Sequence, residues 1–179
     1  MTEKGIPMKR IIVIGCSGSG KTTFAEKLRD KTGFPLFYLD AIWHKPDRTH
    51  IQREEFDARL SEILAHDLWI IDGNYSRTVE RRIVACDTVF FFDLPADVCL
   101  DGAISRLGKG RYDMPWIDTE LDPKLKEEIE SFHEKNRPAI YALLEKYKDG
   151  KNIVIFQSRS QADDFIRGIK NGSQKGHLP

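Results

Sequence analysis

The sequence has no excess of either charge and no cysteine framework. Its 179 residues contain 28 Lys plus Arg against 28 Asp plus Glu, so the formal net charge is zero. Proteins dedicated to duplex DNA usually have a basic excess, so this balance disfavours direct nucleic-acid binding. The three cysteines, Cys16, Cys86 and Cys99, form no CxxC pair. Their pattern favours reduced thiols and a cytoplasmic protein.

Long hydrophobic runs are also absent. The longest, residues 88–94, has the length of a strand, whereas a membrane-spanning helix needs about 20 apolar residues, so no membrane association is expected. Residues 1–9 have no apolar signal core and are predicted to be an N-terminal extension. Residues 171–179 are predicted to be a flexible tail. With no repeat or linker between them, residues 10–170 are predicted to form one domain.

Between these ends, short apolar runs alternate with amphipathic stretches. The predicted strands are residues 10–14, 36–39, 68–71, 88–92 and 151–156. The predicted helices are residues 21–31, 53–65, 78–84, 96–107, 123–148 (bent near Pro138) and 161–169. This alternation predicts a parallel sheet with helices on both faces. Gly15, Asp40, Asp72 and Asp93 directly follow or end predicted strands, and ligands of such sheets bind at the carboxyl ends of the strands.

A glycine-rich run, GCSGSGKTT at residues 15–23, links the first strand to the first helix. Gly15, Gly20, Lys21 and Thr22 match the phosphate-binding pattern GxxxxGK[ST], in the strand-to-helix context that the pattern requires. Lys21 is expected to reach the β- and γ-phosphates, Thr22 to ligate Mg²⁺ and Thr23 to contact the α-phosphate. The residues predicted to bind the nucleotide are Gly15, Ser17, Gly18, Ser19, Gly20, Lys21, Thr22 and Thr23.

Other classes of P-loop protein fit the sequence less well. A signalling GTPase needs a guanine-reading NKxD segment, which the chain lacks, and the chain is too short for the extra strands of a motor ATPase. The small-molecule and nucleotide kinases remain. The predicted activity is therefore transfer of the γ-phosphoryl group of ATP, with Mg²⁺, to a small-molecule acceptor.

Three segments together resemble a known group. GCSGSGKTT, YLDAIWHKPD and WIIDGNYS are similar to the bacterial topology modulation proteins, which are P-loop proteins related to adenylate kinase, and the resemblance spans nearly all of residues 10–166. It implies a three-layer α/β sandwich of the P-loop NTPase type, with five parallel strands in the order 2-3-1-4-5 and a short lid. It also implies a nucleotide or nucleoside as the acceptor. A small hydroxyl compound of another kind, or a nucleotide-binding regulator with little turnover, is the alternative, and the chain is expected to be a monomer or homodimer.

The resemblance assigns roles around the phosphate loop. Asp72 is expected to support Mg²⁺, with Asp93 as its rival, and either could instead cap a turn. Arginines stabilise transferring phosphoryl groups, and Arg106, Arg111 and Arg137 are the candidates, each with a solvated surface charge as the alternative. Residues 108–122 stand in the place of the adenylate kinase lid and have no zinc-binding cysteines. Residues 157–160 stand where such kinases contact adenine.

The acceptor is expected to bind residues 41–66 and the segment after the third strand. Asp40 is placed to hold or deprotonate an acceptor hydroxyl. Trp43 either contacts the acceptor or packs against the helix at 53–65, and both readings stay open; His44 is a weaker candidate. The residues predicted to bind the acceptor are Asp40, Trp43, Gly73, Asn74, Tyr75 and Arg77.

Overall fold

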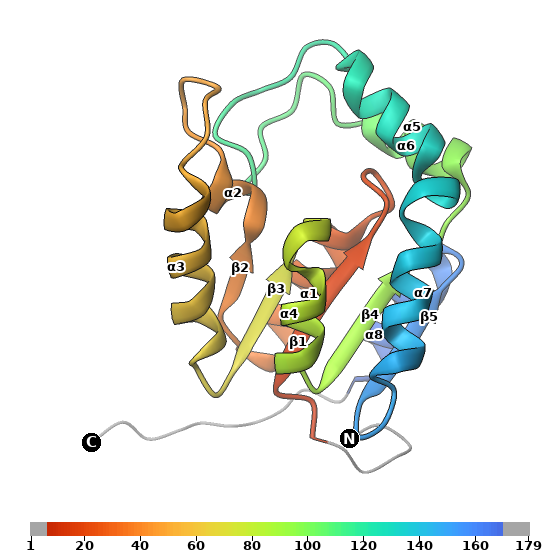
Figure 1. Cartoon of the computed structure of the whole chain (residues 1–179). Helices are drawn as coiled ribbons and strands as arrows, with labels where there is room; N and C mark the ends of the chain where they lie inside the picture. The colour runs from red at the N-terminus through yellow and green to blue at the C-terminus, as the bar shows by residue number, and fades with distance from the viewer. Residues whose placement is uncertain (1–6, 170–179) are drawn as a thin grey trace.

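Five parallel strands form one sheet in the order β2-β3-β1-β4-β5 in the computed structural model, which describes residues 7–169 (Figure 1). The predicted fold class and strand order are therefore confirmed. The central strands are buried on both faces, which is why they read as continuous apolar runs in the sequence. The strands are β1 Arg10–Gly15, β2 Leu36–Tyr38, β3 Trp69–Asp72, β4 Thr88–Phe92 and β5 Asn152–Phe156.

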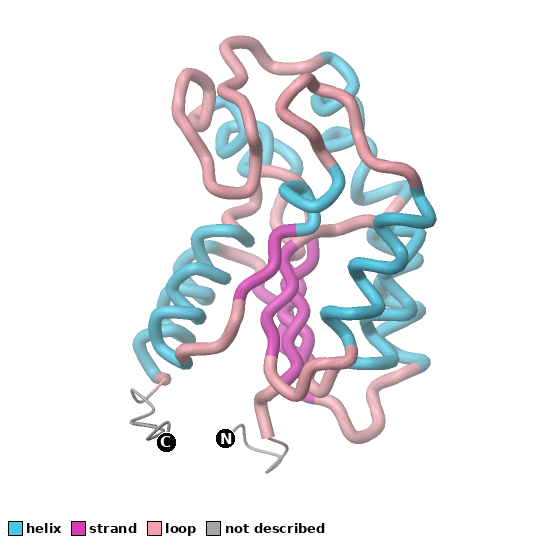
Figure 2. The backbone as a smooth tube through the Cα atoms, turned by 90° about the vertical axis from the view of Figure 1, so that its left-hand side faces the viewer, coloured by secondary structure: helices cyan, strands magenta, loops and turns pink. Residues whose placement is uncertain are grey.

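Helices cover both faces of the sheet, as Figures 1 and 2 show. α1 packs against α8 on one face, and α4 packs against α7 on the other. The helices are α1 Lys21–Thr32, α2 Leu39–Trp43, α3 Arg53–Leu64, α4 Ser76–Ala85, α5 Ala96–Ile104, α6 Pro123–Lys135, α7 Arg137–Lys146 and α8 Arg159–Gly168. None of the helices within residues 7–169 is long and apolar enough to cross a membrane.

Three predictions about the helices were wrong by more than two residues or missed a helix. The long helix at 123–148 is two helices, because Pro138 has no N–H to donate and the chain breaks at Asn136. The helix predicted at 96–107 ends at Ile104, so Arg106 lies in the turn beyond it. The short helix α2 was not predicted, and it places Asp40 in its first turn rather than at the end of a strand.

Aromatic packing holds α1 against the sheet. The Phe24 ring meets Phe90, Phe92 and Phe156 edge-on, with centroids 4.8 to 5.4 Å apart. All four side chains are buried, and edge-to-face aromatic pairs of this kind add to the free energy of burial. Because Phe24 lies in the first turn of α1, this cluster also sets where the phosphate loop sits.

The two predicted terminal segments fall largely outside the described part of the chain. Residues 1–6 of the extension and the whole of the tail at 171–179 lie outside residues 7–169. The division of residues 10–170 into an acceptor segment at 41–66 and a lid at 108–122 stays a prediction.

Candidate active site

The loop between β1 and α1 is built to expose backbone N–H groups. Helix α1 begins at Lys21, and its N-cap, Gly20, has a φ of 105° and supplies no side-chain cap. The first N–H groups of a helix have no partner within the helix, so here they stay available to an anion. Lys21 lies at the same point, where its Nζ donates to the Cys16 carbonyl at 2.7 Å.

Helix α5 packs directly on the backbone of this loop. A Cβ placed on Gly102 would lie 2.1 Å from the Gly18 carbonyl oxygen, and one on Gly18 would lie 2.0 Å from that of Cys99. Side chains at these two positions would therefore force the loop and the helix apart. The close approach shows why glycine stands at 18 and 102.

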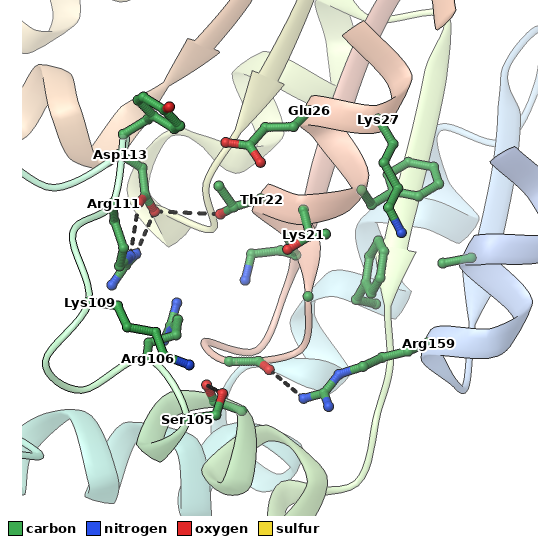
Figure 3. Close-up of a pocket in the computed structure, with 18 of the residues that line it drawn as sticks. Lys21, Thr22, Glu26, Lys27, Ser105, Arg106, Lys109, Arg111, Asp113 and Arg159 are labelled. Carbon is green, nitrogen blue, oxygen red and sulfur yellow. Dashed lines mark hydrogen bonds and ion pairs between the residues drawn. The ribbon is translucent and has the colours of Figure 1, made fainter. Parts of the chain in front are cut away.

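Arg159, at the start of α8, holds the loop from another side. Its Nη2 donates to the carbonyls of Gly18 at 2.9 Å and Val98 at 3.0 Å, and thereby ties the loop to α5 (Figure 3). Arg159 also lines the cavity beside the loop. The sequence marked residues 157–160 only by position, and no pattern distinguished this arginine.

Thr22 and Asp72 form the closest side-chain contact at the loop. The Thr22 hydroxyl donates to Asp72 Oδ2 at 2.6 Å, while Asp72 Oδ1 has no hydrogen-bond partner among residues 7–169. Asp72 is only 5% exposed. Burial raises its pKa to about 6, against the opposing charge of Lys21 and the hydrogen bond from Thr22. An unpaired buried carboxylate oxygen beside a hydroxyl suits a hard cation such as Mg²⁺.

Asp93, the rival carboxylate, is occupied elsewhere. Arg137 donates to both of its carboxylate oxygens, at 2.7 and 2.9 Å, and the Tyr141 hydroxyl donates at 2.7 Å. Asp93 thus anchors α7 to the end of β4. Arg137 was predicted to reach the phosphates, but the structure does not bring it there, because this ion pair holds it and it lines neither cavity beside the loop.

The turn after α5 and the segment that follows it bring charged side chains over the loop. Arg106 and Lys109 point toward Lys21 in Figure 3, and Arg106 donates to the Ser17 hydroxyl at 3.3 Å. The Arg106 Nε is buried and has no partner among the described residues. Burial lowers the pKa of Arg106, and neighbouring Arg111 lowers it further. The guanidinium therefore has donor capacity left for an anionic ligand.

Asp113 is a site residue that the sequence did not single out. It is buried, accepts from Arg111 Nε at 2.9 Å, and lies 3.5 Å from the Thr22 hydroxyl (Figure 3). The segment 108–122 has no periodicity, so nothing in the sequence predicted which of its side chains turns inward. The arginine two residues earlier was the only available signal.

Two cavities meet at the loop. One, of about 530 Å³, extends from the loop toward α8 and is lined by Phe24, Lys27 and Arg159. The other, of about 640 Å³, extends toward α2 and α6. Their shared wall consists of Lys21, Thr22, Arg106, Lys109, Arg111 and Asp113. We call the first the nucleotide cavity and the second the acceptor cavity.

The acceptor cavity gathers most of the predicted acceptor residues. Asp40, Trp43, Gly73, Asn74 and Tyr75 line it, as does His44. The Tyr75 hydroxyl donates to Asp40 at 2.9 Å. Trp43 packs edge-on against Phe56 of α3, with ring centroids 5.5 Å apart, and it also lines the cavity, so its contact with the acceptor stays a prediction.

Two arginines near this segment act outside the cavity. Arg77 pairs with Asp57 at 2.7 and 2.9 Å and does not line the cavity, so the structure does not bring it to the acceptor residues. Arg82 is fully buried and donates to the carbonyls of Gly73, Asn74 and Tyr75, the stretch that forms one wall. Arg82 is therefore a positioning residue. The sequence did not reveal it, because it reads as one charge among several on α4.

A parallel sheet of order 2-3-1-4-5, with a GxxxxGK[ST] loop after β1, defines the fold of the P-loop kinases. Comparison with known proteins agrees. An adenylate kinase from Mycolicibacterium smegmatis (strain ATCC 700084 / mc(2)155) is 28% identical over 174 residues, which cover 81% of this chain and 89% of that protein. No family model matches the chain.

Solved structures of two kinases share the fold. Shikimate kinase from Bacteroides thetaiotaomicron superposes with a TM-score of 0.55 and 18% identity, over 90% of this chain and 96% of that one. A sugar kinase from Janibacter sp. HTCC2649 superposes with a TM-score of 0.50 and 20% identity, over 90% and 91%. These likenesses establish the fold, while the resemblance to topology modulation proteins stays a prediction.

Proposed function

We propose that this protein is an ATP-dependent phosphotransferase that moves the γ-phosphoryl group to a small acceptor. The observation that carries the proposal is the meeting of two cavities at Lys21 and Thr22. A kinase must hold donor and acceptor on opposite sides of one transferring group. A protein that only binds a nucleotide has no need of the second cavity.

The phosphate side of the site is cationic. The free N–H groups at the start of α1 bind the phosphates, and Lys21 reaches the β- and γ-phosphates. Arg106 approaches from the turn after α5 and Arg111 from the lid, and both neutralise charge on the transferring group. The sugar and base of ATP occupy the nucleotide cavity beside Arg159.

The residues present fit Mg²⁺. Thr22 supplies a hydroxyl and Asp72 a buried carboxylate whose Oδ1 has no partner among residues 7–169. Oxygen ligands of this kind, through water where needed, are what Mg²⁺ prefers. When bound, the ion neutralises phosphate charge and orients the γ-phosphoryl group.

Asp40 is the residue that holds the acceptor hydroxyl. It lines only the acceptor cavity, and Tyr75 orients it by hydrogen bonding. A carboxylate so placed accepts the hydroxyl proton as the oxygen attacks phosphorus. The resemblance implies a nucleotide or nucleoside as the acceptor, and another hydroxyl compound is the alternative, as the kinship of fold with a shikimate kinase and a sugar kinase suggests.

The test is ADP formation from Mg-ATP with a panel of nucleotides, nucleosides, sugars and amino alcohols. Lys21→Ala is the control, and ATP binding is measured for both proteins. At least one acceptor should raise turnover of wild type about 100-fold above the variant. If wild type binds ATP but no acceptor raises turnover above the Lys21→Ala background, the protein is a nucleotide-binding regulator and the proposal fails.

A further inference from the structure

We infer that the acceptor is a hydroxyl compound that has a protonated amine and no phosphate of its own. This rests on the proposed function, because it names the ligand of the acceptor cavity. The structural basis is the distribution of charged residues between the two cavities. One end of the acceptor cavity lies at the wall that it shares with the nucleotide cavity, and we call the opposite end its far end.

Every lysine and arginine that lines the acceptor cavity also lines the nucleotide cavity. These residues are Lys21, Arg106, Lys109 and Arg111, and all four therefore surround the transferring phosphoryl group. The carboxylates that line the acceptor cavity alone, Asp72 of the magnesium site aside, are Asp40, Asp118, Glu120, Asp122 and Glu128. Away from the transfer point, the charged groups of the wall are thus negative.

The protein itself does not neutralise these five carboxylates. Asp118 accepts from the Trp116 indole at 2.8 Å, and Asp122 accepts from the Lys124 backbone N–H at 2.8 Å. Asp40 accepts from the Tyr75 hydroxyl. These donors are uncharged, and within residues 7–169 none of the five forms an ion pair with lysine or arginine. Glu120, Asp122 and Glu128 are exposed to solvent, and Asp40 and Asp118 are partly buried.

Among residues 7–169, no lysine or arginine lines the acceptor cavity away from the wall that it shares with the nucleotide cavity, so a phosphorylated acceptor would find no cation in the lining of the far end. Arg77 forms an ion pair with Asp57, and Arg137 forms one with Asp93. Arg82 donates its hydrogen bonds to backbone carbonyls. Burial lowers the pKa of His44, so this histidine adds no charge at neutral pH. A second phosphate would meet like charges, whereas an ammonium group would meet opposite ones.

The aromatic lining agrees with a cation. Trp43, Tyr75 and Trp116 line the same cavity as the carboxylates, and aromatic faces attract ammonium groups. Arg48, which does not line the cavity, lies 5.3 Å from the centre of the Trp116 ring, so one cation–π contact already forms at this wall. A volume of about 640 Å³ suits a compound of the size of an amino sugar or aminocyclitol.

Direct binding tests the charge preference without depending on turnover. Two series share a scaffold and differ in charge: glucosamine, glucose and glucose 6-phosphate; and streptamine, myo-inositol and myo-inositol 1-phosphate. AMP represents the nucleotide acceptors, measured with the nucleotide cavity saturated by a non-hydrolysable ATP analogue and Mg²⁺. In calorimetry, at least one amine should bind about tenfold more tightly than its neutral parent, and the phosphorylated member should bind most weakly.

A double variant tests whether carboxylates of the acceptor cavity cause the preference for the amine. Asp118→Asn combined with Glu128→Gln should lower the affinity for the amine about tenfold and leave that for the neutral parent unchanged. Glu127→Gln is the matched control, because Glu127 neighbours Glu128 on α6 but pairs with Lys135 and does not line the cavity. Unfolding curves confirm that all variants are folded.

The inference is overturned if AMP or a phosphorylated member binds most tightly, if no amine binds, or if the double variant keeps the amine affinity of wild type. Its failure is distinct from failure of the proposed activity. Turnover with AMP or glucose 6-phosphate would contradict the amine as acceptor and support the kinase activity. Tighter binding of the amine without any turnover would support the amine as ligand and contradict the kinase activity.

Discussion

Asp72 and Asp93 look alike in the sequence, since each is an aspartate at the end of a buried strand. Their surroundings separate them, because Asp72 faces the Thr22 hydroxyl and Asp93 is enclosed by Arg137 and Tyr141. The ranking of Asp72 as the metal-supporting residue stays a prediction, and the geometry favours it.

Replacing each of these two aspartates by asparagine tests which of them supports the metal. Asp72→Asn should lower kcat/KM for Mg-ATP at least about tenfold and raise the Mg²⁺ concentration needed for half-maximal rate, because it weakens a carboxylate at the metal. Asp93→Asn is the matched control, with the same chemical change one strand away, and should leave the Mg²⁺ requirement unchanged. Steady-state ADP formation over a Mg²⁺ titration measures both, and the reverse order would reassign the metal site to Asp93.

The Asp93 ion pair makes a prediction about stability at low pH. Burial raises the pKa of Asp93, but the hydrogen bonds from Arg137 and Tyr141 outweigh it and hold the pKa below its ordinary value of 3.8. A depressed carboxylate pKa stabilises the fold above the unfolded-state value, and that stability is lost as the pH falls through the folded-state pKa.

Arg137→Gln should therefore lower the free energy of unfolding by about 1–2 kcal/mol at neutral pH, less than a fully buried charge pair because the arginine side chain is 41% exposed. The difference from wild type should shrink as the pH falls below 3.8, the ordinary pKa of the carboxyl group. Urea unfolding at a series of pH values measures it. An equal difference at both ends of the series would show that Arg137 acts by packing rather than by charge.

At the scale of elements, the contact between α5 and the phosphate loop decides whether the site can form. Gly102→Ala would place a Cβ against both the Gly18 carbonyl and Arg159. ATP affinity should fall at least about tenfold, and the free energy of unfolding should fall by about 1–3 kcal/mol. The reason is that the added Cβ can be accommodated only if the backbone of the phosphate loop or of α5 moves. Gly168→Ala at the end of α8 is the control, since nothing lies within 4 Å of its added Cβ.

Calorimetric ATP binding and urea unfolding follow both glycine variants. Unchanged ATP affinity in Gly102→Ala would mean that the loop does not depend on α5 for its shape. The sequence predicted the helix that contains Gly102 but not its contact, because a helical pattern records the face of a residue and not the distance to its neighbour.

The lid is a second case in which the sequence did not predict a tertiary contact. Its position at 108–122 follows from the absence of periodicity and from the resemblance, and the structure carries it across the top of the sheet toward α2, where Trp116 meets His44 edge-on at 5.1 Å (Figure 1). Which of its side chains turns inward was not predictable. Asp113 is buried only because Arg111 and the loop at Thr22 close over it.

At the scale of the whole molecule, the two cavities share one wall and open on opposite sides of it. Both substrates should therefore be bound together, and the phosphoryl group should pass directly between them without a covalent enzyme intermediate. Initial rates with both substrates varied should give intersecting double-reciprocal lines. Parallel lines, or a phosphorylated enzyme isolated after incubation with Mg-ATP alone, would contradict this arrangement.

The local pattern of the sequence determined the fold, the phosphate loop and the edge of the sheet at which Asp40 and Asp72 gather, because buried strands, helix faces and glycine spacing are encoded over a few neighbouring residues. Only the tertiary structure decided which charges are free. Arg77 and Arg137 are paired and Arg82 is buried, whereas the carboxylates that line only the acceptor cavity form no ion pair with lysine or arginine among residues 7–169. The pairs of Arg77 with Asp57 and of Arg137 with Asp93 depend on distances between residues far apart in the chain, and no local pattern records those distances.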